Sequence, residues 1–593
     1  MVKDIEHIDI SDIKDPAFVK NLDYKGLDVL CSDIREEIIK ETSIYGGHLS
    51  SNLGVVELTV ALHRSFDFPK DKLIFDVGHQ CYAHKILTGR HLEHLNEKGF
   101  VSGYQKIGES EYDCYEAGHS STSLSAAEAF AIARDQKKEK YDVVALIGDG
   151  SIVNGLSFEA LNDIGSRNHK VIIVLNDNDM SISKPTGGLG RFFRSISTQK
   201  AYNKFKQGYK RVMLRTTLGK KLYSISYALK SSLKRRLVPI TMFDNMGFTY
   251  MGPYDGHNIK VLERAFKKAK VATKSVVLHV YTTKGRGYTY AEKDTSGYWH
   301  GVTPFDIETG QPKNLHPGQI SWSHYFSDLT NEIMAKFPET ELIVPATLKG
   351  SGLEQAFRLF PNRCIDVGIA EEHAVTMAGA LALNGLHPIV VIYSTFLQRA
   401  YDEISHDCAR LNVNMTILVD RAGLVGSNGE THQGIYDEAF LKSIPGVVVT
   451  MPSDQSEAKA LYHQSLDNHE VDVGEASDQN TFAFRKTHLA SAHPIHRGHR
   501  SHGIDVEFTD NGILKRGPGG VINIRGSVER NLHDPDLRPR IVRGRDIKTA
   551  RIAVTPQKRR QEQGFAGIDC SDDINIVPSS LRLNPGGNLF DVG

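Results

Sequence analysis

The strongest constraint on the fold is a short apolar strand that runs directly into a glycine-rich turn. Residues 143–147 are all apolar, and Gly148-Asp149-Gly150 follows them without a break. A stretch with helical spacing of its apolar residues comes next, and a second apolar run covers 171–175. Apolar strands joined by a helix predict a βαβ unit in a parallel sheet that is buried on both faces.

The alternation of strand and helix continues to about residue 470. Beyond residue 340, the predicted strands are 365–367, 388–393, 415–419 and 447–450, and the predicted helices are 371–384, 396–411 and 455–468. A polar stretch rich in proline and glycine, 309–318, predicts a linker before this second set. A chain of 593 residues is also too long for one hydrophobic core. We therefore expect two three-layer α/β domains, residues 1–315 and 316–470.

The overall charge argues against a protein devoted to nucleic acids or membrane surfaces. Lys plus Arg and Asp plus Glu both number 71, so the formal net charge is zero. Residues 190–240 hold fourteen basic and no acidic residues, which leaves open an anionic partner, although a mobile solvated insert is the simpler interpretation. No apolar run approaches the length of a membrane span.

The N-terminus and the cysteines favour a cytoplasmic protein. The first residues are polar and acidic, which predicts neither a secretory signal nor a transit peptide. The six cysteines are scattered with no CxxC pair, which is typical of reduced thiols.

Composition and patterning both change after residue 470. Residues 1–470 contain 35 Lys and 18 Arg, whereas residues 471–593 contain 4 Lys and 14 Arg, and the periodic apolar runs stop. The helix at 455–468 should lead into another buried strand, yet 472–480 supplies none. We expect residues 471–593 to be a disordered tail, from a shifted frame or a fusion, in place of a further domain.

Two oxygen-bearing side chains lie at the ends of neighbouring predicted strands. Asp149 follows the first strand and Asn178 follows the second, 29 residues later. The carboxyl ends of parallel strands are where α/β sheets bind phosphorylated ligands. Carboxylate, amide and backbone carbonyl oxygens suit Mg²⁺ that shares a diphosphate. An ordinary turn at the end of a strand is the alternative.

This arrangement resembles the thiamin-diphosphate binding motif, and further motifs resemble the 1-deoxy-D-xylulose-5-phosphate synthase family. They occur in order at 46–54, 76–80, 118–123, 284–288, 370–373, 393–399 and 431–434. The resemblance runs from about residue 25 to 470 and implies a thiamin-diphosphate fold. It also implies Mg²⁺, a homodimer, and the condensation of pyruvate with D-glyceraldehyde 3-phosphate, with loss of CO₂, to 1-deoxy-D-xylulose 5-phosphate.

The resemblance also implies roles for particular residues. Glu371 would activate the cofactor through its aminopyrimidine ring, although a helix N-terminal glutamate is also favoured by the helix dipole. The implied catalytic histidines are His48, His300 and His432. The implied cofactor ligands are His79, Gly118, His119, Ser120, Gly150, Ser151, Asn178, Tyr288 and Glu371. The implied metal ligands are Asp149, Asn178 and the Met180 carbonyl, and the implied substrate ligands are Tyr393, Arg399, Arg421 and Asn428.

Two departures leave other functions open. The family usually has Asp-Gly before the Thr-His pair, where this chain has Asn428-Gly429. Family members also continue into a strand that ends in Tyr-Pro-Arg-Gly and then into a third α/β domain, neither of which the sequence predicts here. The alternatives are a transketolase-like enzyme with other substrates and an inactive chain that still binds the cofactor.

Overall fold

A computed structural model describes most of the first 466 residues and four strands beyond them. The described residues are 6–178, 188, 242–294, 296–313, 320–425 and 430–466, with the backbone of 481–487, 505–509, 512–517 and 520–523. The chain divides into two compact units, 1–492 and 493–593. The basic stretch 190–240 and the second half of the predicted linker lie outside the described residues.

The first unit contains two parallel sheets, and the first of them has five strands. Their order is β1-β2-β3-β5-β4, and each neighbouring pair is parallel. The strands are β1 (Lys72–Phe75), β2 (Val143–Gly148), β3 (Ile172–Asp177), β4 (Thr249–Asp255) and β5 (Val276–Tyr281). The βαβ unit predicted from 143–175 is confirmed, with α6 (Gly155–Ser166) between β2 and β3.

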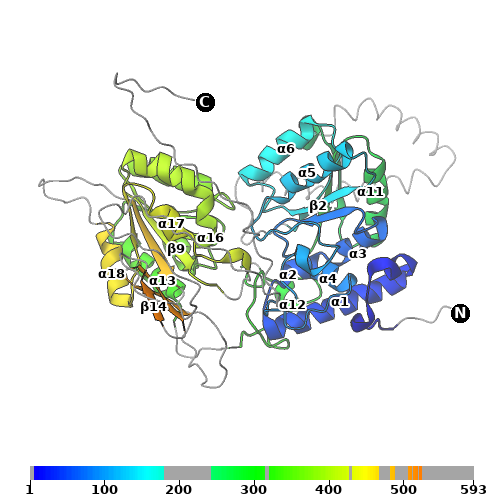
Figure 1. The fold of residues 1–593 in the computed structure, drawn as a ribbon, viewed down its shortest axis with the longest axis horizontal. Helices are drawn as coiled ribbons and strands as arrows, with labels where there is room; N and C mark the ends of the chain where they lie inside the picture. Colours follow the sequence, from blue (N-terminus) through cyan, green and yellow to red (C-terminus); the bar gives the residue numbers. More distant parts are fainter. Residues whose placement is uncertain are drawn as a thin grey trace, which may run out of the picture. The chain divides into compact units, whose positions relative to one another are not determined.

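Helices cover both faces of this sheet, which explains why β2 is apolar throughout. The helices on one face are α1 (Tyr24–Tyr45), α3 (Val56–Ser65) and α11 (Ile259–Val271). Those on the other face are α5 (Ser123–Gln136), α6 and α10 (Met242–Asn245). Figure 1 shows α5 and α6 on one side of β2 and α3 on the other. Side chains of β2 alternate between the two cores, so each apolar position is buried.

Shorter elements connect these layers. They are α2 (Ser50–Gly54), α4 (Tyr82–Leu87), α12 (Thr289–Glu292), and the 3₁₀ turns η1 (Ile10–Asp12), η2 (Pro16–Asn21) and η3 (Ile107–Glu109). Among the described residues, no helix is both long and apolar enough to cross a membrane.

The second sheet has six parallel strands in the order β10-β11-β9-β8-β6-β7. The strands are β6 (Thr340–Val344), β7 (Cys364–Asp366), β8 (His387–Tyr393), β9 (Thr416–Ala422), β10 (Val447–Thr450) and β11 (Thr481–Thr487). The helices over its two faces include α13 (Trp322–Lys336), α14 (Glu354–Leu359) and α18 (Gln455–Gln464) on one side and α15 (Glu371–Leu383) and α17 (Asp437–Leu441) on the other. Most predicted strand and helix positions in this half of the chain agree with these bounds.

The helix predicted over 396–411 is confirmed in extent, because residues 394–411 are helical throughout, but it is not a regular α-helix. The segment is a succession of short pieces: α16 (Ser394–Leu397), η4 (Gln398–Ala400), a π-helical turn η5 (Glu403–Cys408) and η6 (Ala409–Leu411). The π turn packs on α15, where Gly379 brings that helix within contact of Asp407 and Cys408. This close approach between helices is a long-range feature that periodicity does not report.

The expectation that regular strands stop at residue 470 is also wrong. Strand β11 lies between β10 and β9, pairing in parallel with both. The strand that should follow the α18 helix is therefore present, beginning directly after the segment 472–480 in which we looked for it. Its sequence, Thr-Phe-Ala-Phe-Arg-Lys-Thr, holds only a short apolar run and does not end in Tyr-Pro-Arg-Gly.

Because β11 lies between β9 and β10, we expect the thermal stability of truncated variants to depend on whether they keep this strand. A variant ending at residue 470 should lose cooperative unfolding of the second sheet or aggregate, because the backbones of β9 and β10 would lose their shared partner. A variant ending at residue 492 keeps β11 and should melt like the full chain. Thermal melting of the two variants by circular dichroism tests this, and equal melting temperatures would contradict the strand's structural role.

The second unit, described by itself, contains a small antiparallel sheet. Its strands are β12 (Asp505–Thr509), β13 (Gly512–Gly517) and β14 (Gly520–Asn523), paired in sequence order. These strands contradict the expectation of a tail wholly without regular structure.

Candidate active site

The first unit has a buried cleft with walls from both parallel sheets. It is bounded by the carboxyl ends of β2 and β3, by loops that follow α1 and β1, and by the start of α15. It holds about 950 Å³ of space, its open side included. The predicted site residues that line it are His48, His79, Gly118, Ser120, Asp149, Gly150, Ser151, Asn178, His300, Glu371 and His432. Segments more than 300 residues apart in the sequence thus meet at one cavity.

One end of the cleft carries the predicted metal ligands. Asp149 and Asn178 both line it, and the Asp149 backbone N–H donates to the Asn176 carbonyl at 3.1 Å, which joins the two strand ends. Burial, with Asp177 nearby, raises the pKa of Asp149 to about 7. A buried carboxyl group with a raised pKa gains most from a cation that pairs with its ionised form. Met180 lies outside the described residues.

Lys284, which the sequence analysis did not single out, also lines this end of the cleft. Burial lowers the pKa of its ammonium to about 8, and the charge of Asp149 opposes that shift. A lysine and an aspartate in one buried cavity provide opposite charges for a ligand that carries both anionic oxygens and a metal ion.

The turn after β2 differs from its predicted form. We expected the next helix to begin near Gly150 and to offer the N–H groups of Gly150 and Ser151 to a phosphate. The helix α6 begins instead at Gly155, capped by Asn154, whose side chain accepts from Leu156 N at 3.0 Å. The Ser151 N–H already donates to the Gly148 carbonyl at 3.2 Å. The helix dipole is therefore displaced by one turn from the predicted phosphate position.

Glu371 also lines the cleft, and it is the first residue of α15. Its side chain is 3% exposed, and its Oε2 atom accepts no hydrogen bond from the described residues. Burial raises the pKa of Glu371 to about 7, although the nearby Arg399 opposes the shift. A carboxyl group of this kind can hold or release a proton near neutral pH.

Arg399, predicted to bind substrate phosphate, occupies a different place. Its Nη1 atom lies 3.7 Å from Glu371 Oε2 and 3.4 Å from the Ser120 hydroxyl, and its Nη2 atom donates to the Ser120 carbonyl. The side chain therefore ties α15 to the loop 118–123. These contacts favour a role in positioning Glu371.

The loop 118–123 is held in place from the other side by a buried carboxylate. Asp76 accepts hydrogen bonds from the Ser121 N–H at 2.9 Å and the Ser123 hydroxyl at 2.7 Å. At Gly118, an added Cβ would lie 2.3 Å from Thr431 Cβ, so only glycine permits this approach. The loop thus forms a rigid wall of the cleft.

Three predicted histidines gather in the middle of the cleft. The ring centroids of His48, His79 and His300 lie 5.0–5.7 Å from one another. Nitrogen atoms of all three are buried without a hydrogen-bond partner among the described residues: His48 Nδ1, both ring nitrogens of His79, and His300 Nδ1. Unpaired buried nitrogens carry a desolvation cost that a bound polar ligand would relieve.

The cleft histidines are neutral at physiological pH. Burial lowers the pKa of His48 to about 4 and that of His432 to about 3, and holds those of His79 and His300 well below the usual value. Each ring then has one N–H donor and one acceptor nitrogen. The group therefore supplies neutral hydrogen-bond donors.

Several residues around the cleft have left-handed backbone conformations that side chains disfavour. Val77 (φ 63°) and Ala346 (φ 59°) line the cleft, and Ser121 (φ 77°) and Arg421 (φ 55°) lie beside lining residues. A β-branched residue such as Val77 is rare in this region. Strain that gathers at one cavity is typical of functional sites.

The remaining predicted residues do not line the cleft. The His119 Nε2 atom lies 2.8 Å from the Thr395 hydroxyl, and its ring lies 5.4 Å from that of His432. The Arg421 guanidinium lies 4.2 Å from the ring centre of Tyr393, which stacks on Phe396 at 5.7 Å. These side chains form a layer behind the cleft.

Tyr288 is placed in the protein core. Its hydroxyl donates to the Ile307 carbonyl at 2.8 Å, and its ring packs against Trp299 and Phe305. This placement favours the core role over cofactor binding. Asn428 lies outside the described residues.

Further lining residues went unnoticed in the sequence. Asp76, Lys284 and Phe396 fall within the motifs that carried the family resemblance, so their motif membership was a usable signal. Tyr104 falls in none of those motifs. It reaches the cleft through long-range contacts, which no local pattern could have indicated.

The donor set of the cleft fits thiamin diphosphate and a divalent cation. Asp149, Asn178 and Lys284 offer hard oxygen ligands and a cation at one end, which suits a magnesium-bound diphosphate. Glu371 offers a buried carboxyl oxygen without a hydrogen-bond partner among the described residues, in a lining that also includes the apolar side chains of Ile369 and Phe396, which suits an aminopyrimidine ring.

Comparisons with known proteins agree with this arrangement. The family model described as 1-deoxy-D-xylulose-5-phosphate synthase matches residues 10–282, and the model described as transketolase, pyrimidine binding domain, matches residues 318–472. Among solved structures, a transketolase from Leishmania mexicana superposes with a TM-score of 0.35 at 15% identity, over 78% of this chain and 77% of that chain, a likeness too weak to support an argument.

Curated relatives are much more similar in sequence. A protein of Listeria welshimeri is 46% identical over 513 residues, which is 86% of this chain and 77% of that protein. A protein of Macrococcus caseolyticus is 46% identical over 465 residues, 78% of this chain and 74% of that protein. Both are named 1-deoxy-D-xylulose-5-phosphate synthase.

Proposed function

This chain belongs to the 1-deoxy-D-xylulose-5-phosphate synthase family, and we propose that its buried cleft is the site where that reaction occurs. The enzyme is a transferase that uses thiamin diphosphate to condense pyruvate with D-glyceraldehyde 3-phosphate, yielding 1-deoxy-D-xylulose 5-phosphate and CO₂. One observation carries the proposal: Asp149, Asn178 and the buried Glu371 carboxyl group line a single cavity.

Asp149 and Asn178 would hold Mg²⁺, with the Met180 carbonyl that the family resemblance implies, and Lys284 would neutralise part of the diphosphate charge. The bound cofactor supplies a nucleophilic thiazolium carbon to the reaction. Opposite charges within a buried cavity fix the diphosphate more firmly than they would in water, because the surroundings screen them less. The charged end of the ligand thus sets the position of its reactive ring.

Glu371 would hold or release a proton for the aminopyrimidine ring of the bound cofactor. Its pKa of about 7 leaves both the acid and the ionised form populated near neutral pH, which is the condition for efficient proton transfer. Arg399, 3.7 Å from Glu371 Oε2, orients the carboxyl group and limits how far its pKa rises.

The neutral imidazoles of His48, His300 and His432 donate hydrogen bonds or protons to the oxygens of the substrates. Each addition to a carbonyl group develops negative charge on oxygen, which a nearby N–H donor stabilises. Arg421 contacts the ring of Tyr393, which stacks on Phe396, and Phe396 in turn contacts His432. A guanidinium group in this place suits a substrate phosphate.

Turnover and cofactor binding together test the proposal. Purified protein should release CO₂ from pyruvate when D-glyceraldehyde 3-phosphate, thiamin diphosphate and Mg²⁺ are present, and chelation of the metal should stop it. Transfer from ketose phosphates in place of pyruvate would favour a transketolase-like activity. Cofactor binding without CO₂ release would identify a chain that lacks synthase activity.

We further propose that the chain forms a homodimer. Gly423 and Gly434 pair as an isolated bridge, and exposed apolar side chains follow both residues in the sequence: Leu424 (74% exposed), Ile435 (45% exposed) and Tyr436 (64% exposed). Clustered exposed apolar groups mark protein contact surfaces. Sedimentation should give twice the chain mass of 65.8 kDa, and Leu424→Lys should shift the population towards monomer. A native protein that sediments as a monomer would contradict the proposal.

A further inference from the structure

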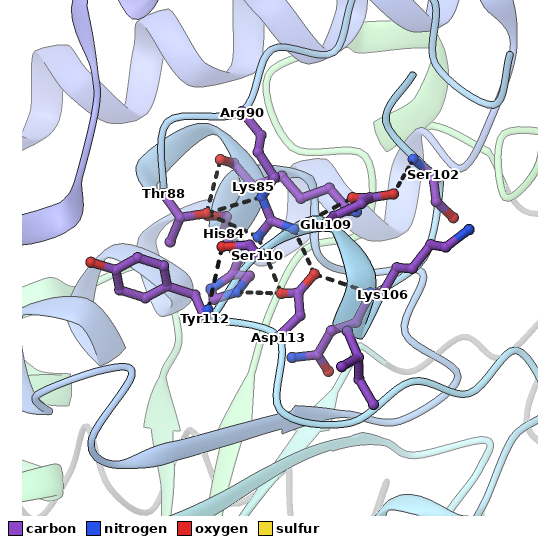
Figure 2. Close-up of polar contacts among 12 residues, drawn as sticks. His84, Lys85, Thr88, Arg90, Ser102, Lys106, Glu109, Ser110, Tyr112 and Asp113 are labelled. Carbon is purple, nitrogen blue, oxygen red and sulfur yellow. Dashed lines mark hydrogen bonds and ion pairs between the residues drawn. The ribbon is translucent and has the colours of Figure 1, made fainter. Parts of the chain in front are cut away.

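A network of buried charged side chains fixes residues 102–106, which follow α4 in the domain of the first sheet. Figure 2 shows it: His84 Nε2 lies 3.0 Å from Asp113 Oδ1, Arg90 Nη1 lies 2.5 Å from Asp113 Oδ2, and the Lys85 ammonium pairs with Glu109. The side chains of His84, Lys85 and Asp113 are fully buried. Burial alone would raise the pKa of Asp113, but hydrogen bonds from His84 and Arg90 hold it below the usual value.

The two carboxylates of this network also accept hydrogen bonds from the backbone of residues 102–106. Glu109 Oε1 accepts from the Ser102 N–H at 2.7 Å, and Asp113 Oδ2 accepts from the Lys106 N–H at 3.0 Å (Figure 2). Both ends of the segment are thereby fixed. Buried ion pairs are expensive to assemble and contribute little net stability, so their role here is better explained as geometric.

Gln105 fixes the centre of the same segment. Its backbone N–H donates to the Gly78 carbonyl at 3.0 Å, and its side chain bonds the Phe75 N–H at 3.1 Å and the Leu73 carbonyl at 2.9 Å. The segment is therefore tied to β1 and to the loop that carries His79. The residue next to Gln105 is Tyr104, whose position follows from these anchors.

Tyr104 lies in the cleft between histidines from the two parallel-sheet domains. Its ring centre lies 5.3 Å from that of His48, edge to face, and 5.4 Å from that of His432, stacked. The residue is 4% exposed, and no hydrogen bond joins its hydroxyl to the described residues. Burial raises the pKa of Tyr104, although the charge of Arg421 opposes the shift, so the hydroxyl stays protonated as a donor.

We propose that the Tyr104 hydroxyl donates a hydrogen bond to an oxygen of the phosphorylated aldehyde acceptor and so contributes to acceptor selection. This inference rests on the proposed function. We assign the hydrogen bond to the acceptor and not to pyruvate because the ring of Tyr104 stacks on that of His432 and the charge of Arg421 acts on its hydroxyl. Arg421 is the residue proposed to bind the phosphate of the acceptor. The side chain of Tyr104 lines the cleft beside neutral imidazoles, and a hydroxyl in that place is suited to bind a ligand oxygen.

The test is Tyr104→Phe, which keeps the ring and its contacts and removes only the hydroxyl. We expect the KM and the calorimetric Kd for D-glyceraldehyde 3-phosphate, the latter measured on the holoenzyme without pyruvate, to rise about three- to tenfold. The KM for pyruvate, the affinity for thiamin diphosphate and the melting temperature should stay unchanged. Tyr112→Phe, eight residues later in the chain and outside the cleft lining, is the matched control.

The outcomes separate this inference from the proposed function. If the parent protein turns over both substrates but Tyr104→Phe binds the acceptor as tightly as the parent, the inference is overturned and the function stands. A change confined to pyruvate also overturns it. If the parent protein fails to form product, the proposed function fails, while the acceptor Kd still reports whether the hydroxyl contacts that ligand.

Discussion

Replacing Asp149 with alanine should abolish the magnesium-dependent binding of thiamin diphosphate. The carboxylate lies at the buried end of the cleft beside Asn178 and Lys284, and without it the metal would lose its one charged protein ligand among the residues proposed to hold it. Removing one partner from a buried charge pair costs roughly 2–5 kcal/mol, which lowers affinity roughly 30- to 3,000-fold.

Calorimetric titration of thiamin diphosphate with and without Mg²⁺ measures the effect. Asp163→Ala is the matched control, because Asp163 lies on the following helix with its side chain 46% exposed and pairs with Arg167. If Asp149→Ala bound the cofactor with parental affinity and parental dependence on Mg²⁺, Asp149 would not be the metal ligand.

The same carboxyl group makes stability depend on pH in a defined direction. Asp149 ionises near 3.8 in the unfolded chain and near 7 in the fold, so the folded protein holds more protons between these values. Its contribution to the free energy of unfolding therefore falls as pH rises from about 4 to about 7 and is constant above that range. In the absence of cofactor, Asp149→Asn should remove this contribution and melt at a higher temperature than the parent at pH 8.

The sequence predicted the sheets well where apolar strands and glycine-rich turns coincide. The strand over 143–147 and its Gly-Asp-Gly turn placed Asp149 at the carboxyl end of β2, as observed. Burial on both faces makes every residue of such a strand apolar, so the signal is strong. The start of α6 was predicted several residues early, because the turn and the helix share small and polar residues.

The second sheet shows the limit of local patterns. Strand β11 has only a short apolar run, and its identity as a strand depends on β9 and β10, which lie on either side of it. The π turn at Glu403–Cys408 likewise depends on its contact with α15. Strand pairing and helix packing across long sequence separations override local propensity in both segments.

The candidate site was predictable to the extent that each residue lies in a local motif. His48, His79 and Glu371 fall in such motifs, and all three line the cleft. The cleft also contains Tyr104, whose position is set by Glu109 and Asp113 through backbone hydrogen bonds. A charged cluster that acts on a neighbouring loop has no signature in composition or periodicity.

Replacing Glu371 with glutamine should leave cofactor binding nearly intact and slow cofactor activation severely. Glutamine keeps the size of the side chain and can still accept a hydrogen bond, but its amide does not exchange a proton near neutral pH. Loss of a positioned acid–base group costs about 100- to 10,000-fold in rate. The thiazolium proton of the bound cofactor should exchange with D₂O more slowly by that factor, as measured by quenched-flow NMR, and CO₂ release should fall in parallel.

Glu372→Gln is the matched control, because Glu372 is the next residue of α15 and lies outside the cleft lining. Its exchange rate should match the parent. The parent rate should also vary with pH around 7, where Glu371 titrates, and that variation should disappear in Glu371→Gln. A helix-capping glutamate would give a different result: the substitution would weaken the favourable interaction with the helix dipole, lowering the melting temperature slightly, and exchange would proceed at the parental rate. That outcome would remove Glu371 from the proton-transfer step and leave the cleft without an assigned activator.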